Sequence, residues 1–263
     1  MNGTNPLAVV TGASSGIGFE LAKQFARHGY DLVIAAEDAA LDSAAVTLRD
    51  QGTDVRTVRV DLATYDGVET LWGALSAASR PVDALVLNAG VGRGGAFLET
   101  DLADEARIID LNITSTVHLA KRVLPGMVAR DRGRVLITSS IAATTPGSFQ
   151  SVYNASKSFL QSFAQALQNE LKDSAVTVTS LMPGPTETNF FRRAEMLDTK
   201  VGRAKKDDAA QVAEQGYDAL MAGRPKLVAG SLKTKAQGVA NRVLPDRVKA
   251  AGHRRMAEPR RGR

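Results

Sequence analysis

A glycine-rich turn between a short apolar run and a helical pattern lies near the N-terminus of the chain. The run Leu7–Val10 leads directly into TGASSGIG (residues 11–18), and apolar residues at helical spacing follow. A strand, a turn and a helix in this order are typical of dinucleotide-binding units. Gly12 permits the tight turn, Gly16 lets the backbone approach a pyrophosphate, and Gly18 allows close helix–sheet packing. Glycines also cluster in tight loops without a ligand, but the position at the first strand–helix junction favours a cofactor turn.

Further short, β-branched runs alternate with helical patterns as far as about residue 230. Most of these runs are continuously apolar, as in parallel strands that are covered on both faces. Strands that alternate with helices indicate right-handed crossovers and an open parallel sheet, and therefore an α/β fold. The expected strands are Leu7–Val10, Leu32–Ala35, Val55–Val60, Ala84–Leu87, Arg134–Thr138, Val176–Leu181 and Lys226–Val228.

The positive charge of the chain is concentrated at its C-terminal end. The 263 residues carry a formal charge of +5, but residues 231–263 hold ten Lys or Arg against two acids, a local charge of +8 that leaves −3 for residues 1–230. An Arg-rich end can bind nucleic acid or a membrane, although a solvated tail explains the charge more simply. We expect a single domain over residues 1–244 and a basic, flexible tail over 245–263, in which a frayed helix precedes the end.

The composition argues against several kinds of site. The chain has no cysteine, which excludes disulfides and thiolate metal ligands. Its three histidines, His28, His118 and His253, are far apart in sequence, so we expect no metal site. No apolar run approaches the roughly 18 to 20 residues of a membrane span, and no secretory signal is visible. These observations predict a cytoplasmic protein.

A set of short motifs follows the glycine turn in a specific order. After TGASSGIG come Asp61-Leu62, Asn88-Ala89-Gly90, Asn112, Ser139-Ser140, Tyr153-Asn154-Ala155-Ser156-Lys157 and Pro183-Gly184. This ordered set, over about residues 5–230, resembles the short-chain dehydrogenase/reductase family in its single-domain form of about 250 residues. The resemblance implies a doubly wound Rossmann-type three-layer sandwich with a mostly seven-stranded parallel sheet.

Four residues match the catalytic positions of that family. Tyr153 and Lys157 are four residues apart at the start of a helix, so both side chains emerge on one face. Such a pair alone is typical of a helix surface, but Ser140, thirteen residues before Tyr153, ends a strand where open α/β sheets place ligands. Strand alternation turns the neighbouring Ser139 to the other side.

The resemblance implies a role for each member of this group. Tyr153 is the general acid/base, and Lys157 lowers the tyrosine pKa and holds the nicotinamide ribose. Ser140 orients the substrate carbonyl or carbinol. Asn112 lies at a local break in its helix, where its backbone carbonyl helps to hold a water that relays protons from Lys157.

The resemblance also implies a set of cofactor-binding residues. They are Gly12, Ser14, Ser15, Gly16, Ile17, Gly18, Glu37, Asp61, Leu62, Asn88, Ala89, Gly90, Tyr153, Lys157, Pro183, Gly184, Thr186 and Thr188. Within this set Asp61 accepts from the adenine amine, Asn88 lies along the cofactor, and Thr188 contacts the nicotinamide or the pyrophosphate.

The choice between NAD and NADP depends on the residues that follow the second strand. Ala36 occupies the usual position of the NAD-selecting Asp, and Glu37 replaces the Arg common in NADP-preferring members. Ser15 also stands where NADP enzymes often carry Lys or Arg. Glu37 and Asp38 would repel a 2′-phosphate, so NAD is favoured over NADP. Alternatively, these two acids merely begin the following helix, where acidic residues are favoured.

The expected function is a metal-free alcohol/ketone oxidoreductase that transfers a hydride between NAD(P) and a hydroxyl or carbonyl substrate. The alternative is a dinucleotide-sensing or interaction protein on the same fold, without turnover. Residues from about 185 to 206 correspond to the family's substrate lid. There, Phe190, Phe191, Met196 and Leu197 form either an apolar wall or a helix packed on the body. Arg192 and Arg193 either meet an acidic substrate or are solvated, and solvation is the favoured interpretation. The resemblance implies a homodimer or homotetramer, in which the helices containing Asn112 and Tyr153 pair.

Overall fold

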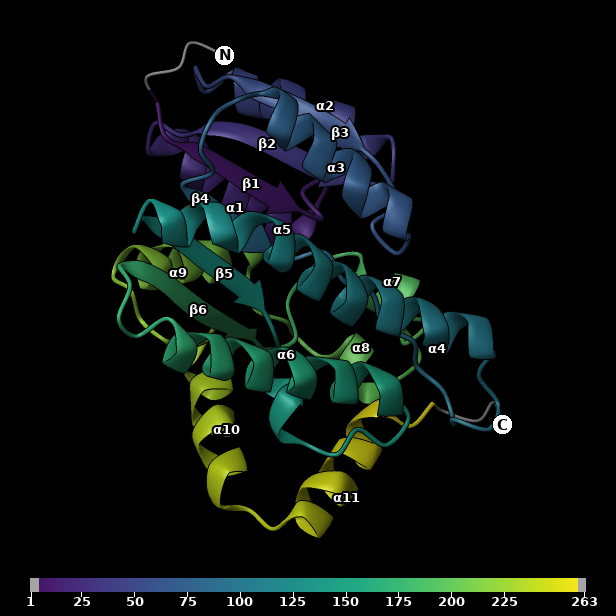
Figure 1. The fold of residues 1–263 in the computed structure, drawn as a ribbon. Coiled ribbons are helices and arrows are strands. Elements are labelled where there is room, and N and C mark those ends of the chain that lie inside the picture. Colours follow the sequence, from purple (N-terminus) through teal and green to yellow (C-terminus); the bar gives the residue numbers. More distant parts are fainter. Residues whose placement is uncertain (1–4, 260–263) are drawn as a thin grey trace.

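Seven parallel strands form one sheet through the centre of the molecule (Figure 1). The computed structural model describes residues 5–259, apart from the side chain of Arg242. The strand order is β3-β2-β1-β4-β5-β6-β7, and every pairing in it is parallel, which confirms the predicted doubly wound sheet. The strands are β1 (Leu7–Thr11), β2 (Asp31–Ala36), β3 (Val55–Arg59), β4 (Ala84–Leu87), β5 (Gly133–Thr138), β6 (Val176–Pro183) and β7 (Lys226–Ala229).

Helices cover both faces of the sheet, and each face has its own hydrophobic core. On one face α3 (Tyr65–Ala77), α5 (Ser115–Ala129) and α6 (Ser151–Glu170) contribute Leu71, Leu119 and Leu160. On the other face α1 (Gly16–Arg27), α2 (Ala40–Arg49) and α9 (Ala209–Met221) contribute Phe25, Leu41 and Leu220. Because β1, β2 and β4 are buried at every position, their residues are apolar on both faces rather than alternating, apart from Thr11 and Asp31 at strand ends.

The remaining helices are short or lie beyond the sheet. They are α4 (Leu102–Ile108), a π-helix (Ile109–Thr114), a 3-10 helix (Ile141–Thr144), α7 (Phe190–Arg193), α8 (Lys200–Arg203), α10 (Leu232–Val243) and α11 (Asp246–Ala257). Several helices begin at a residue whose side chain accepts a backbone N–H bond, as Thr64 does for α3 and Asp208 for α9. Ser15, at the start of α1, makes no such bond.

The strand order reverses between β1 and β4, which places the candidate site. From β1 the chain proceeds to β2 and β3 on one side, and then returns to β4 and continues to β7 on the other. The loops after β1 and β4 therefore diverge and leave a crevice at the carboxyl ends of these strands. The glycine turn, Asn88 and Ser140 all follow strands at this edge.

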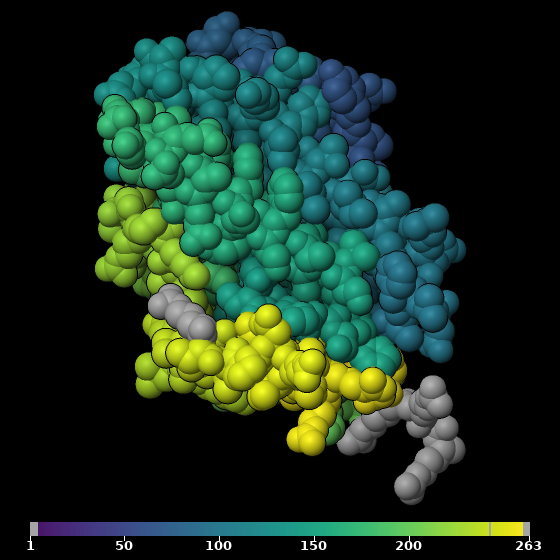
Figure 2. All heavy atoms as spheres, turned by 60° about the horizontal axis from the view of Figure 1, so that its bottom comes forward, coloured from purple at the N-terminus to yellow at the C-terminus, as the bar shows by residue number. Residues whose placement is uncertain are grey.

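The C-terminal segment contains the helix that the sequence predicts within residues 245–263, but this helix is packed on the body rather than frayed. Residues 246–257 form α11, and α10 and α11 lie together at one end of the molecule (Figures 1 and 2). The helix is ordered by packing: Ala257 is buried beside Phe191 and Met196, and the guanidinium of Arg254 lies over the Phe149 ring. Residues 260–263 lie outside the described residues, and the division of the chain at residue 244 stays a prediction.

Among the helices of residues 5–259, none is both long enough and apolar enough to cross a bilayer. Within the same residues no cluster of His, Asp or Glu has the arrangement of a metal site.

Candidate active site

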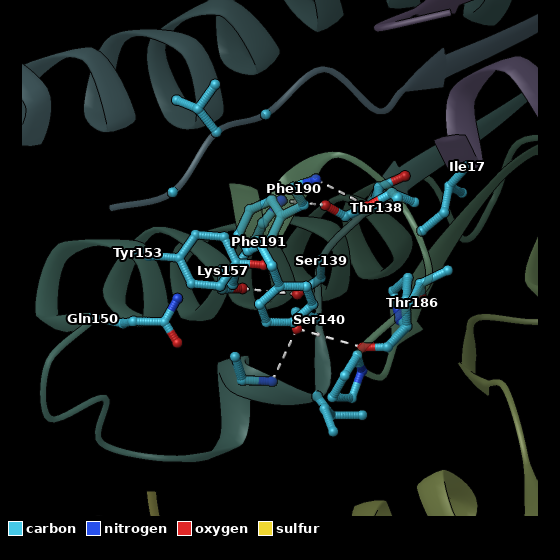
Figure 3. A pocket seen from close by; sticks show the side chains of 18 of the residues that line it. Ile17, Thr138, Ser139, Ser140, Gln150, Tyr153, Lys157, Thr186, Phe190 and Phe191 are labelled. Carbon is cyan, nitrogen blue, oxygen red and sulfur yellow. Dashed lines mark hydrogen bonds between the residues drawn. The ribbon is translucent and has the colours of Figure 1, made fainter. Parts of the chain in front are cut away.

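A cavity of about 640 Å³ opens at the crevice in the sheet edge (Figure 3). Its wall combines the glycine turn, the residues that follow β2, β4, β5 and β6, the start of α6, and the C-terminal helices. All the predicted cofactor residues line it. Of the four predicted catalytic residues, Ser140, Tyr153 and Lys157 line it and Asn112 does not.

The glycine turn is shaped by close approaches that exclude side chains. Gly12 and Gly16 have positive φ angles of 66° and 59°, which other residues rarely adopt. A Cβ on Gly12 would lie 2.9 Å from the Cα of Ala89, and one on Gly16 would lie 2.9 Å from Thr188 Cγ2. A Cβ on Gly18 would overlap the carbonyl oxygen of Gly12, so Gly18 allows α1 to pack against the turn itself. The turn therefore leaves the N-terminal N–H groups of α1 open to the cavity.

Asn88 fixes the turn to the sheet. Its Nδ2 donates to the carbonyl of Thr11 (3.1 Å), and its Oδ1 accepts from Thr138 Oγ1 (3.1 Å). The hydroxyl of Thr11 in turn accepts from the backbone N–H groups of Asn88 (3.0 Å) and Ala89 (3.1 Å). These bonds hold the ends of β1, β4 and β5 in one arrangement along the cavity.

Tyr153, Lys157 and Ser140 come together on the floor of the cavity (Figure 3). Lys157 is 4% exposed, and its Nζ donates to the carbonyl of Thr138 (2.9 Å) and lies 5.8 Å from the centre of the Tyr153 ring. Ser140 Oγ accepts from the backbone N–H of Ala142 (3.1 Å) and is 3.4 Å from the carbonyl of Pro183. Ser139, by contrast, donates its hydroxyl to the carbonyl of Lys157 (2.8 Å) and is buried.

The electrostatics of this group follow from burial. Burial raises the pKa of the Tyr153 phenol to about 12, and the neighbouring Ser140 hydroxyl opposes that shift. Burial lowers the pKa of the Lys157 ammonium to about 8. At neutral pH Tyr153 therefore keeps its proton, and Lys157 is mainly charged.

Asn112 lies behind the cavity, in a π-helical turn between α4 and α5. Its side chain is fully buried and accepts from the N–H of Val91 (2.9 Å) while it donates to the carbonyl of Val91 (3.0 Å) and to Ser156 Oγ (3.0 Å). The predicted local break in the helix is thus present as a π-helix. The side chain ties the loop after β4 to α6, one position before Lys157.

The end of the cavity near β2 carries a cluster of charges that sequence reasoning did not predict. Arg107, from α4, forms ion pairs with both Glu37 and Asp61. Its hydrogen bond and charge hold the pKa of the Asp61 carboxyl below its usual range. Asp38 accepts a hydrogen bond from Ser14 Oγ (2.9 Å). No sequence spacing links Arg107 to these acids, because the contact exists only once α4 is placed beside the sheet.

The lid segment (residues 185–206) covers part of the cavity. Phe190 and Phe191 line it, and the Phe190 ring is 5.1 Å from that of Tyr153 (Figure 3). Met196 is fully buried, whereas Leu197 is 54% exposed and does not contribute to the wall. Both predicted alternatives are thus partly present, with two phenylalanines facing the cavity and a methionine packed into the body.

The C-terminal helices form part of the cavity wall. Leu244, Val248 and Met256 give this side an apolar surface, with the polar groups of Asn241 and His253 between them. His253 Nδ1 is 3.0 Å from the carbonyl of Ser148, and burial lowers the pKa of its imidazole. The sequence shows no apolar periodicity here, so nothing in it points to a wall of the site.

Comparison with protein families gives one match over most of the chain. The family model described as short chain dehydrogenase matches residues 6–197. Among curated proteins, an uncharacterized oxidoreductase, YmfI, of Bacillus subtilis is 31% identical over 72% of this chain and 78% of its own length. The NADP-dependent 3-hydroxy acid dehydrogenase YdfG of Salmonella typhimurium is 29% identical over 81% and 87% of the two chains.

Solved structures resemble the whole fold. A short-chain dehydrogenase from Sphingobium yanoikuyae in complex with NADPH has a TM-score of 0.78 and 30% identity, with 90% of this chain and 94% of that chain covered. A short chain dehydrogenase/reductase from Burkholderia phymatum in complex with NAD has a TM-score of 0.82 and 25% identity, with both chains covered in full.

Proposed function

This chain belongs to the short-chain dehydrogenase family and is an oxidoreductase of that family, and from this premise we propose that it interconverts an alcohol and a ketone or aldehyde with Tyr153 as general acid/base. The observation that carries the proposal is the convergence of Tyr153, Ser140 and Lys157 in the cavity beside the glycine turn. A nicotinamide dinucleotide fits this cavity, because the cavity has a volume of about 640 Å³ and is lined by the glycine turn, by the start of α1 and by the residues that follow β2 and β4. When bound, that cofactor supplies or accepts the hydride.

Tyr153 is suited to donate a proton during reduction of a carbonyl. Its pKa of about 12 keeps the phenol protonated at neutral pH before substrate binds. In the oxidation direction the phenolate needs stabilisation, and the charged Lys157 ammonium next to the ring provides it. The Ser140 hydroxyl accepts from Ala142 N–H and donates over 3.4 Å to the carbonyl of Pro183, a long bond that it exchanges for one to the substrate oxygen.

Lys157 serves both directions of the proposed reaction and also contributes to cofactor binding. Its ammonium is anchored on the carbonyl of Thr138, and it retains further N–H donors for a ribose hydroxyl. Asn112 acts as a positioning residue through Ser156 and Val91. We further propose that the backbone carbonyl of Asn112 holds a proton-relaying water, since a π-helix frees backbone groups from the regular ladder.

The chain binds a nicotinamide cofactor, and we propose that it prefers NAD over NADP. Glu37 and Asp38 line the end of the cavity where a dinucleotide fold reads the adenosine ribose, and carboxylates there accept from a 2′-hydroxyl and repel a 2′-phosphate. The Arg107 guanidinium beside Glu37 opposes that repulsion and reduces the preference. Titration of the protein with NADH and NADPH tests it, and tighter binding of NADPH would refute the preference.

The substrate side of the cavity favours a bulky, largely apolar alcohol or ketone. Phe190 and Phe191 on the lid and Leu244 and Val248 at the C-terminal helices supply apolar surface around the space next to Ser140. The homodimer or homotetramer and the cytoplasmic location stay predictions from the sequence. Phe159 on α6 is 40% exposed and is compatible with helix pairing.

The experiment that tests the function compares Tyr153→Phe with Tyr65→Phe. Removal of the Tyr153 hydroxyl should lower turnover of a ketone panel by about 10²- to 10⁴-fold, because general acid catalysis is lost, while cofactor binding survives. Tyr65 lies on α3 and is 66% exposed, so its variant should keep wild-type turnover. Full activity of Tyr153→Phe would contradict the mechanism. Cofactor binding by the wild-type protein without any turnover would favour the alternative of a dinucleotide-sensing protein.

A further inference from the structure

Arg193, at the end of α7, reaches across the cavity to the glycine turn. Its Nη2 donates to Ser15 Oγ (3.2 Å), although the two residues are 178 positions apart in the sequence. Both residues line the cavity. The sequence pattern favours a solvated arginine at this position, and Arg193 is indeed exposed, but the lid also brings its guanidinium to the glycine turn.

The contact occurs at the N-terminus of α1, a helix of twelve residues. Ser15 precedes the first turn, but its side chain does not cap the helix and instead accepts from Arg193. The first N–H groups of α1 are therefore open to an anion. Thr188, also on the lid, lies over Gly16 in the same turn. Two lid residues thus meet the turn where a dinucleotide places its pyrophosphate.

Few of the side chains that line the cavity are positively charged, and they lie in different parts of its wall. Its Lys and Arg residues are Lys157, Arg193 and Lys249. Lys157 is held on the carbonyl of Thr138 at the catalytic end, and Lys249 pairs with Asp246 on α11 (2.7 Å). Of these three cations, Arg193 is the one that makes a hydrogen bond to the glycine turn.

The present partner of Arg193 is easily exchanged for a phosphate. Among the described residues Arg193 forms no ion pair, and its bond to Ser15 joins an exposed guanidinium to a neutral hydroxyl. A hydrogen bond of this kind is weaker than one to an anionic oxygen, and a guanidinium offers paired donors that match phosphate geometry. No carboxylate has to be released before the anion binds.

We propose that Arg193 binds the pyrophosphate of the nicotinamide cofactor and thereby couples closure of the lid to cofactor binding. The inference rests on the proposed cofactor site and adds to it a residue from outside the family's motifs. The pyrophosphate is preferred to the adenosine 2′-phosphate as the ligand. The lid meets the turn at Ser15 and Gly16, whereas the ribose end is occupied by Glu37 and Asp38, which repel a phosphate.

The test compares Arg193→Met with Arg192→Met. Arg192 is the adjacent residue on α7, is exposed, and bonds only to Asn189 Oδ1 (2.9 Å) among the described residues, so its loss matches the change in charge. Isothermal titration calorimetry measures the Kd of NADH, NADPH and ADP-ribose for each protein. Arg193→Met should weaken all three by about 10- to 100-fold, the usual value of a hydrogen bond to a charged group, and Arg192→Met should remain within about twofold.

A second measurement follows the lid directly. NADH should slow hydrogen exchange of the backbone over residues 188–204 in the wild-type protein and in Arg192→Met, and should protect this segment much less in Arg193→Met at saturating NADH. Arg193→Lys should restore part of the affinity, because the charge is kept while the paired donors are lost.

The outcomes separate this inference from the proposed function. Failure of the wild-type protein to bind any of the three ligands would refute the cofactor site itself. Wild-type binding with an unchanged Kd in Arg193→Met would refute only the role of Arg193. A loss confined to NADPH would also overturn the proposal and assign the guanidinium to the 2′-phosphate.

Discussion

Replacement of Lys157 by Met should change how the stability of the protein depends on pH. Lys157 is 4% exposed, and burial lowers the pKa of its ammonium from 10.5 to about 8. In the unfolded chain the same group keeps its ordinary pKa. Between about pH 8 and 10.5 the unfolded chain therefore holds more protons than the folded protein, and this group makes stability rise with pH in that window.

The size of the effect follows from the shift. Because the pKa of the ammonium falls from 10.5 to about 8 on folding, the charged Lys157 costs about 3 kcal/mol of folding free energy at pH 7 and about 1 kcal/mol at pH 10. Loss of the Nζ bond to the Thr138 carbonyl in the variant costs about 1–3 kcal/mol at every pH. In the variant, the relief of the cost of the buried charge and the loss of the hydrogen bond nearly cancel at pH 7. The difference in relative stability between pH 7 and pH 10 therefore reports the titration of Lys157 alone.

The measurement is urea unfolding of the cofactor-free wild type and Lys157→Met at pH 7, 8, 9 and 10. The stability of the wild type relative to the variant should rise by about 2 kcal/mol across this range. Lys121→Met, which removes an exposed lysine of α5, should run parallel to the wild type. Parallel pH profiles of wild type and Lys157→Met would refute the reasoning, because Lys157 would then titrate at the same pH in both states.

Three further outcomes test other parts of the structure. Gly18→Ala places a methyl group against a backbone oxygen of the glycine turn, so it should lower the free energy of unfolding by about 1–3 kcal/mol and abolish cofactor binding. Gly73→Ala, in open space within α3, should instead raise the free energy of unfolding by about 0.5–1 kcal/mol. Urea unfolding compares the stability of the two variants. Arg107→Met removes the cation beside Glu37, so the ratio of the NADPH to the NADH Kd should rise several-fold, and an unchanged ratio would contradict the role given to that ion pair. Asn112→Ala removes the three hydrogen bonds of a fully buried side chain and should lower the free energy of unfolding by about 2–4 kcal/mol. A loss below about 1 kcal/mol in urea denaturation would be inconsistent with the observed contacts.

Much of the fold is predictable because its determinants are local. A continuously apolar strand has to be covered on both faces, and a glycine turn between such a strand and a helix has few alternatives, so Leu7–Gly18 points to a parallel α/β sheet and to a phosphate site. The spacing of Tyr153 and Lys157, one helical turn apart, likewise places both side chains on the same face of α6.

The C-terminal segment is less predictable because its helix depends on distant partners. The sequence of α11 is polar and lacks an apolar stripe, a pattern that is typical of a solvated tail. Small and amphipathic residues such as Ala257 and His253 pack on the lid and on Ser148 and make the helix a wall of the cavity. A periodicity argument detects only stripes of large apolar residues, and this helix has none.

The sequence by itself determined the order of the motifs that follow the strands, and it identified Ser140, Tyr153 and Lys157 as candidate catalytic residues. Only the tertiary structure decided which charges accompany them. Arg107 reaches Glu37 and Asp61, and Arg193 reaches Ser15, across gaps of 46 to 178 residues. An arginine side chain has no positional pattern along the chain, since its guanidinium acts through space, and so its partner is fixed by the packing of the elements that carry the two groups.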